Sequence, residues 1–200
     1  RILRAIRFAA QLGFEIEEET FEAIKKIAPN MVHVSKERVQ TELTKLLLSP
    51  NPERIELVYE TGISPFVSDA FHKVDRSKMS VNGGLPAKKH IRWAAFLKNA
   101  ADQEVSSVRH DLKLDNDTIY RVRVLVKWLK QPLKPDQTEL RRVMSQVEAS
   151  LYDDLLELKK MVSLETESQE ELETIVRLSA KIREHGDCVT LKDLAVSGSD

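Results

Sequence analysis

The sequence has little cysteine and glycine and no long apolar run, and each shortage excludes a class of protein. Cys188 is the single cysteine in 200 residues, which excludes a disulfide framework and a zinc site built from cysteines. No run of about 18 apolar residues occurs, so no membrane-spanning segment is expected. Six glycines with 42% apolar residues are typical of a soluble, helix-rich protein, and a reducing cytoplasm is the expected location.

Charge is distributed unevenly along the chain. The formal net charge is −1, but residues 76–134 carry 13 basic and 5 acidic side chains, whereas residues 135–200 carry 8 basic and 15 acidic ones. A basic middle in a nearly neutral chain indicates a localised contact with a polyanion. The acidic end argues against a protein that coats nucleic acid along its whole length.

The opening stretch, RILRAIRFAAQLGF, predicts a helix that stops at Gly13. Its arginines, Arg1, Arg4 and Arg7, recur at every third position and span about 120° of the helix surface, so they form one cationic face. No acid precedes Glu15 to pair with them inside this helix. The residues expected to face a core are Ile2, Ile6, Ala9 and Leu12.

Two interpretations of this cationic face stay open. Most charge runs are solvated faces, here paired with acids elsewhere in the fold. Alternatively, the arginines form an anion site, because a guanidinium offers planar, permanently charged donors that suit phosphates and the acceptor edges of bases.

Apolar periodicity predicts helices through most of the remaining chain, and no strand pattern competes with them. The expected fold class is therefore all-α, an irregular helical array. Residues 64–87, which include Asn82-Gly83-Gly84 and Pro86, are expected to be the least regular part. The predicted helices span residues 17–28, 36–48, 53–61, 88–99, 104–112, 115–129, 138–147, 151–162 and 168–184.

The run RILRAIRFAAQLGFEIEEET resembles the neck helix of the class II tRNA nucleotidyltransferases, which comprise the bacterial CCA-adding enzymes and their relatives, the poly(A) polymerases. In that family a Glu-Asp-x-x-Arg motif enters the helix, and Arg1 matches its arginine. The Glu and Asp of the motif would precede Arg1, so the chain is expected to be a fragment of a longer protein.

The resemblance implies roles for individual residues. Arg1, with the Asp of the motif, would read the Watson–Crick edge of an incoming CTP or ATP, and Arg4 and Arg7 would help to hold the nucleotide. A second matching pattern begins at Arg38-x-x-x-Glu42, and these two residues would support the site structurally. As an ordinary i, i+4 pair they would contribute about 0.2–0.5 kcal/mol.

The resemblance also implies a domain division. Residues 1–63 would form the neck, residues 64–187 the body, and residues 188–200 the start of a helical tail domain, with Ser197 where the family commonly has Asn. The catalytic head domain would lie outside the chain, so no catalytic residue is expected here. That head would hold Mg²⁺, CTP and ATP would be the substrates, and the tRNA 3′ end and acceptor region would be the partner, with no membrane involved.

Basic residues in the middle of the chain suit contact with an RNA backbone, which supplies affinity rather than sequence reading. A merely solvated face is the alternative for them. Trp93 and Trp128 lie in apolar patterns and are expected in the core. Scattered histidines complete no ligand set, so no metal site is expected. The candidate RNA-binding residues are Lys88, Lys89, Arg92, Arg121, Arg123, Lys127 and Lys130.

Three functions fit these features. The first is the nucleotide-selecting and tRNA-binding part of a CCA-adding enzyme. The second is the same part of a poly(A) polymerase or an A-adding relative. The third is a non-enzymatic helical module that binds RNA or protein.

Overall fold

The computed structural model describes residues 2–76, 81–162 and 166–185, and it contains helices but no β-strand within these ranges. The predicted all-α class is confirmed. The chain forms two compact units, Arg1–Val126 and Lys127–Asp200, which are described separately. The division into neck, body and tail stays a prediction, and residues 188–200 lie outside the described part. No helix in the described ranges is long and apolar enough to cross a membrane.

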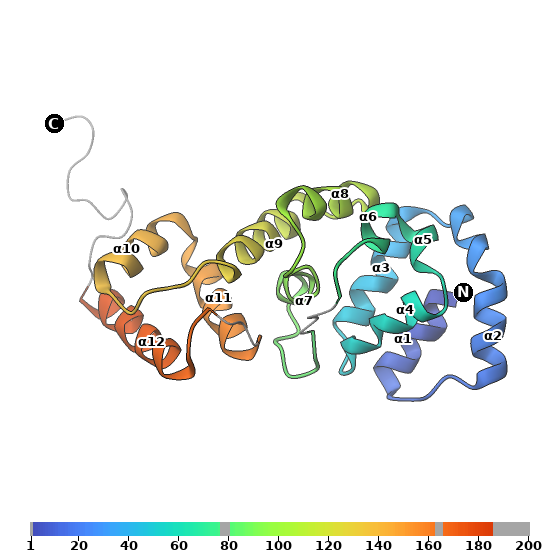
Figure 1. Cartoon of the computed structure of the whole chain (residues 1–200), viewed down its shortest axis with the longest axis horizontal. Helices are drawn as coiled ribbons and strands as arrows, with labels where there is room; N and C mark the ends of the chain where they lie inside the picture. The colour runs from blue at the N-terminus through green and yellow to red at the C-terminus, as the bar shows by residue number, and fades with distance from the viewer. Residues whose placement is uncertain (1, 77–80, 163–165, 186–200) are drawn as a thin grey trace. The chain divides into compact units, whose positions relative to one another are not determined.

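The first unit is a succession of short and medium-length helices (Figure 1). Two of them, η1 and η2, are 3-10 helices, and α9 continues past the end of the unit. In chain order the elements are α1 (Ile2–Leu12), α2 (Glu18–Ile27), η1 (Ala28–His33), α3 (Lys36–Leu47), η2 (Pro52–Ile55), α4 (Glu56–Glu60), α5 (Ser64–Val67), α6 (Asp69–His72), α7 (Lys89–Phe96), α8 (Asp102–Leu112) and α9 (Asn116–Leu129).

Helices α1 and α3 pack side by side and form the part of the core nearest the N-terminus (Figure 1). Ile6 of α1 and Leu43 of α3 are completely buried between them. Helix α1 ends at Gly13, which adopts a φ of 71° and donates its backbone N–H to the Ala9 carbonyl. The expectation for Leu12 is wrong. Its side chain is 58% exposed because it lies about 120° around the helix from Ile6.

An aromatic cluster joins α7 to the segments that precede it. Phe71 lies 5.3 Å from the ring of Tyr59 and 5.5 Å from that of Phe96, measured between centroids, and Phe96 contacts Trp93 edge-on. The indole of Trp93 is completely buried, and Trp128 is buried as well, so the core positions predicted for both are confirmed.

The second unit contains α10 (Gln137–Gln146), α11 (Ala149–Met161) and α12 (Gln169–Glu184), and α12 packs on both others. Its core includes Leu151, Leu155 and Ile175. A fully buried ion pair, Lys159 Nζ to Glu167 Oε1 at 2.5 Å, ties α11 to the segment that enters α12. Lys159 also donates to the carbonyl of Gln131.

The structure confirms the predicted helices with boundaries shifted by a few residues at most, but it corrects the prediction for residues 64–87. That stretch contains α5 and α6, which have only four residues each. Such short helices show no apolar periodicity, so the sequence pattern does not reveal them.

Candidate functional site

A pocket of about 290 Å³ opens among α1, η1 and α3. Its apolar wall includes Met31 and Val34, which lie in and just after η1, a segment that the sequence pattern treats only as the end of a helix. The polar groups come from α1 and α3. The residues that line the pocket are Leu3, Arg4, Met31, Val34, Arg38, Val39, Thr41 and Glu42.

Arg4 is the arginine of α1 that reaches this pocket. Its side chain is exposed, and no described residue forms a hydrogen bond or ion pair with it. Its guanidinium carbon lies 5.8 Å from the ring centroid of Phe8, one turn further along the helix. Arg4 therefore has donors free for an anionic ligand, as predicted for an anion site. Arg1 lies outside the described residues.

Arg7 has a different environment from Arg4. It is only 6% exposed, and its Nε donates to Glu42 Oε2 at 2.6 Å. Its Nη1 donates to the side chain of Gln11, and its guanidinium carbon lies 4.1 Å from the Phe8 ring centroid. The cationic face expected on α1 is thus divided, because Arg7 is already occupied by protein groups.

Glu42 and Arg38 do not form the pair that their spacing suggests. The Glu42 carboxylate accepts from Arg7 instead. The exposed side chain of Arg38 has no hydrogen-bond or ion-pair partner among the described residues, and it lines the pocket beside Arg4. Arg38 therefore joins Arg4 as a second guanidinium in the pocket.

The pocket is electropositive. Two guanidinium groups face it, and the charge of Glu42, its one acidic residue, is balanced by Arg7. Arginine donors beside an apolar wall suit a ligand that carries both an anionic group and a flat or apolar group. Among the described residues, no three His, Cys, Asp or Glu side chains come together to hold a metal ion.

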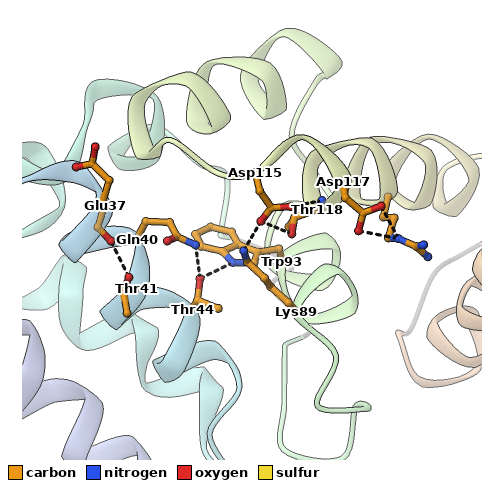
Figure 2. Close-up of polar contacts among 10 residues, drawn as sticks. Glu37, Gln40, Thr41, Thr44, Lys89, Trp93, Asp115, Asp117 and Thr118 are labelled. Carbon is orange, nitrogen blue, oxygen red and sulfur yellow. Dashed lines mark hydrogen bonds and ion pairs between the residues drawn. The ribbon is translucent and has the colours of Figure 1, made fainter.

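The opposite side of α3 is fixed to the core, which sets the rotation of the helix. The Thr44 hydroxyl accepts from the indole Nε1 of Trp93 at 3.1 Å and from Gln40 Nε2 at 3.1 Å (Figure 2). Because Trp93 is held there in the core, it is not available to stack on a nucleotide. The same contacts hold the pocket-lining side of α3 toward α1.

Arg92 has a structural environment that its sequence position did not suggest. It is 2% exposed, and burial lowers the pKa of its guanidinium, an effect that Glu53 opposes. It donates to four backbone carbonyls of the loop before α7, those of Asn82, Gly83, Leu85 and Pro86. The structure corrects the prediction that Arg92 contacts RNA, because its donors are already used inside the protein.

Acidic side chains balance several other predicted RNA contacts. Lys89 Nζ lies 2.5 Å from Asp115, which also caps α9 by accepting from Thr118 (Figure 2). Partial burial raises the pKa of the Asp115 carboxyl, but the hydrogen bonds from Lys89 and Thr118 outweigh it and hold the pKa below its usual range.

The remaining candidates are more exposed. Arg121 pairs with Asp117 at 3.1 Å, and Arg123 pairs with Asp102 at 2.7 Å. Lys88 is exposed in the first unit. The exposed candidates in the second unit are Lys127 and Lys130.

Known proteins resemble the chain in sequence and in fold. A family model described as "Probable RNA and SrmB-binding site of polymerase A" matches residues 13–71. A CCA-adding enzyme of Leuconostoc mesenteroides is 30% identical over all of this chain and 48% of its own length. A CCA-adding enzyme of Geobacillus kaustophilus is 31% identical over 68% of this chain and 35% of its own length.

The same fold occurs in a solved structure. The crystal structure of the Bacillus stearothermophilus CCA-adding enzyme in complex with CTP matches with a TM-score of 0.77 at 20% identity, over all of this chain and 50% of that one. The chain thus spans about half the length of these relatives, or less. The matched region, the sequence identities and the common fold agree with one another, and the chain belongs to the family of CCA-adding enzymes and poly(A) polymerases.

Proposed function

We propose that the chain is the nucleotide-selecting and tRNA-binding part of a template-independent tRNA nucleotidyltransferase that adds CCA to tRNA 3′ ends. The observation that carries the proposal is the pocket of α1 and α3, into which Arg4 presents a guanidinium without a protein partner. The relatives named as CCA-adding enzymes and the related structure with CTP support CTP and ATP as substrates.

Selection without a template requires protein groups that distinguish the bases. Cytosine and adenine each carry an exocyclic amine beside a ring acceptor, whereas uracil and guanine do not. In our proposal Arg1 donates to the ring acceptor, and the Asp of the family motif accepts from the amine. A wrong base would leave buried polar groups unpaired, at a cost of about 1–3 kcal/mol for each.

Arg4 and Arg7 have separate tasks in this proposal. Arg4 contacts the nucleotide, for which its exposed donors are suited. Arg7 holds α1 against α3 through Glu42, so that the two sides of the pocket keep their spacing. A guanidinium locked by two protein groups is a rigid support for a neighbouring site.

The chemical step needs groups that this chain does not supply. Nucleotidyl transfer relies on carboxylates that hold divalent metal ions, but the described residues form no such cluster. We therefore assign none of them to Mg²⁺ and propose that the metal-binding carboxylates lie outside these 200 residues. The chain's own contribution is to bind and orient the nucleotide and the RNA.

Exposed basic residues supply the proposed tRNA contacts. Lys88, Lys89, Arg121 and Arg123 lie in the first unit, and Lys127 and Lys130 lie in the second. Several of them already have an acidic neighbour, so their contribution is electrostatic and backbone-directed. Phosphate contacts of this kind release counterions, and RNA affinity should fall steeply with salt.

The test is incorporation of labelled CTP and ATP by the full-length protein onto tRNA that lacks its 3′ CCA. We expect both nucleotides to be added in the unaltered protein, and Arg1→Ala to reduce or scramble the addition. Addition of ATP alone would replace this proposal with an A-adding relative or a poly(A) polymerase. No addition at all, combined with RNA binding that is insensitive to salt, would favour a non-enzymatic helical module.

A further inference from the structure

We propose that Arg38 is a phosphate-binding residue of the pocket, rather than a structural support of it. This inference rests on the proposed function and names a further residue that contacts the substrate. The phosphate belongs either to the incoming nucleoside triphosphate or to the RNA backbone, and the experiment below separates the two sources.

The position of Arg38 carries the first step of the argument. It lies one turn before Glu42 on α3 and lines the same pocket as Arg4 on α1. Two guanidinium groups from different helices therefore face one space of about 290 Å³. Two arginines that converge from separate elements bind a phosphate with more donors and better geometry than either binds alone.

The absence of a protein partner is the second step. Arg38 is exposed, and no hydrogen bond, ion pair or ring contact joins it to a described residue. A supporting arginine is expected to look like Arg7 or Arg92, both of which are buried and donate to protein acceptors. Arg38 has neither property, so its donors are free for a ligand.

The occupation of Glu42 is the third step. A carboxylate four residues after Arg38 would normally neutralise it. Here Glu42 Oε2 is engaged at 2.6 Å by Arg7, which leaves the two pocket-facing arginines without a counter-charge of their own. Arg7 thus binds the acid of the pocket, and Arg38 and Arg4 remain to bind the anion.

The experiment compares Arg38→Gln with Arg38→Lys in the full-length protein. Lys45→Ala is the matched control, because Lys45 is an exposed cation of the same helix outside the pocket lining. Calorimetry measures the affinity for CTP and for cytidine, and fluorescence anisotropy measures the affinity for tRNA lacking CCA across a salt series. Thermal melting of each variant reports on the fold.

We expect Arg38→Gln to weaken phosphate binding about tenfold or more, since a charge-assisted hydrogen bond is lost. Arg38→Lys should retain part of the affinity, and Lys45→Ala should change nothing. Weaker CTP binding with unchanged cytidine binding assigns the phosphate to the nucleotide. Weaker tRNA binding, with a log–log salt slope reduced by about 0.7–0.9, assigns it to the RNA.

Unchanged affinity for both ligands overturns the inference, as does a lowered melting temperature without a change in affinity, which would make Arg38 a support. Failure of the proposed function is recognised separately, because it appears as a lack of nucleotide addition by the unaltered protein. Nucleotide addition by that protein together with unchanged binding by Arg38→Gln rejects only the role of Arg38.

Discussion

Arg7 and Glu42, which lie 35 positions apart in the sequence, join α1 to α3 through an ion pair of 2.6 Å. The arginine side chain is 8% exposed and the glutamate side chain 24% exposed, so the pair is largely shielded from solvent. Because Gln11 and the ring of Phe8 also contact the guanidinium, its position is fixed on several sides. This pair sets the distance between the two helices that build the pocket.

Removing the acid of this pair should destabilise the protein. Glu42→Ala leaves the buried Arg7 without its main acceptor, and we expect a loss of roughly 1–3 kcal/mol in the free energy of unfolding. Urea denaturation of the variant and of the unaltered protein measures it. Glu37→Ala is the control, because its pair with Lys113 is exposed and should contribute less than about 1 kcal/mol. Equal losses for the two variants would contradict a special role for Glu42.

Replacement of Arg92 tests whether this residue is structural. Arg92→Met removes a charged donor from four buried or partly buried carbonyl contacts, and we expect the free energy of unfolding to fall by roughly 3 kcal/mol. Arg123→Met, which breaks only an exposed pair with Asp102, should cost less than about 1 kcal/mol. An Arg92→Met protein of normal stability but weak RNA affinity would restore the original RNA-binding prediction.

The second unit offers a test of a buried charge pair. Lys159→Met leaves Glu167 buried without its cation, and we expect a loss of about 3–5 kcal/mol, measured by denaturant unfolding. Adding Glu167→Gln to that variant should recover part of the loss, since the amide oxygen can still accept from the backbone N–H of Leu133. A double variant less stable than the single one would show that the charge of Glu167 has another favourable partner.

Acid should weaken the contact between α7 and the start of α9. The pKa of Asp115 is lowered in the folded protein, so its carboxylate contributes stability above the unfolded pKa of about 3.9 and loses that contribution as the pH falls further. We expect the stability difference between the unaltered protein and Asp115→Asn to shrink between pH 5 and pH 2. The effect is modest because the side chain is half exposed. A difference that stays constant over this range would contradict the assignment.

The helices could be predicted well because their causes are local. Gly13 and Gly62 stop helices in left-handed conformations, and apolar spacing marks the buried faces of α3 and α9. The short helices α5 and α6 could not be predicted, because four residues carry no period. The exposure of Leu12 depends on which face of α1 meets α3, and that is decided by packing.

The partners of the arginines could not be predicted for a related reason. Sequence spacing suggests neighbours within one helix, such as Arg38 with Glu42, whereas the structure pairs Glu42 with Arg7 of another helix. Arg92 is buried among the carbonyls of a loop whose path the sequence does not specify. A basic residue in a basic segment is therefore a weak indicator of an RNA contact until its exposure and partners are known.

The close contact of Gly83 with Pro50 has a consequence for how the chain can vary. A Cβ at residue 83 would lie 2.1 Å from the Pro50 carbonyl oxygen, so any side chain there would push the loop away from the turn after α3. Arg92 grips the same loop through the carbonyls of Gly83 and Leu85. Insertions and larger residues should therefore be excluded from this loop over the course of evolution, while exposed stretches such as the start of α2 are free to diverge.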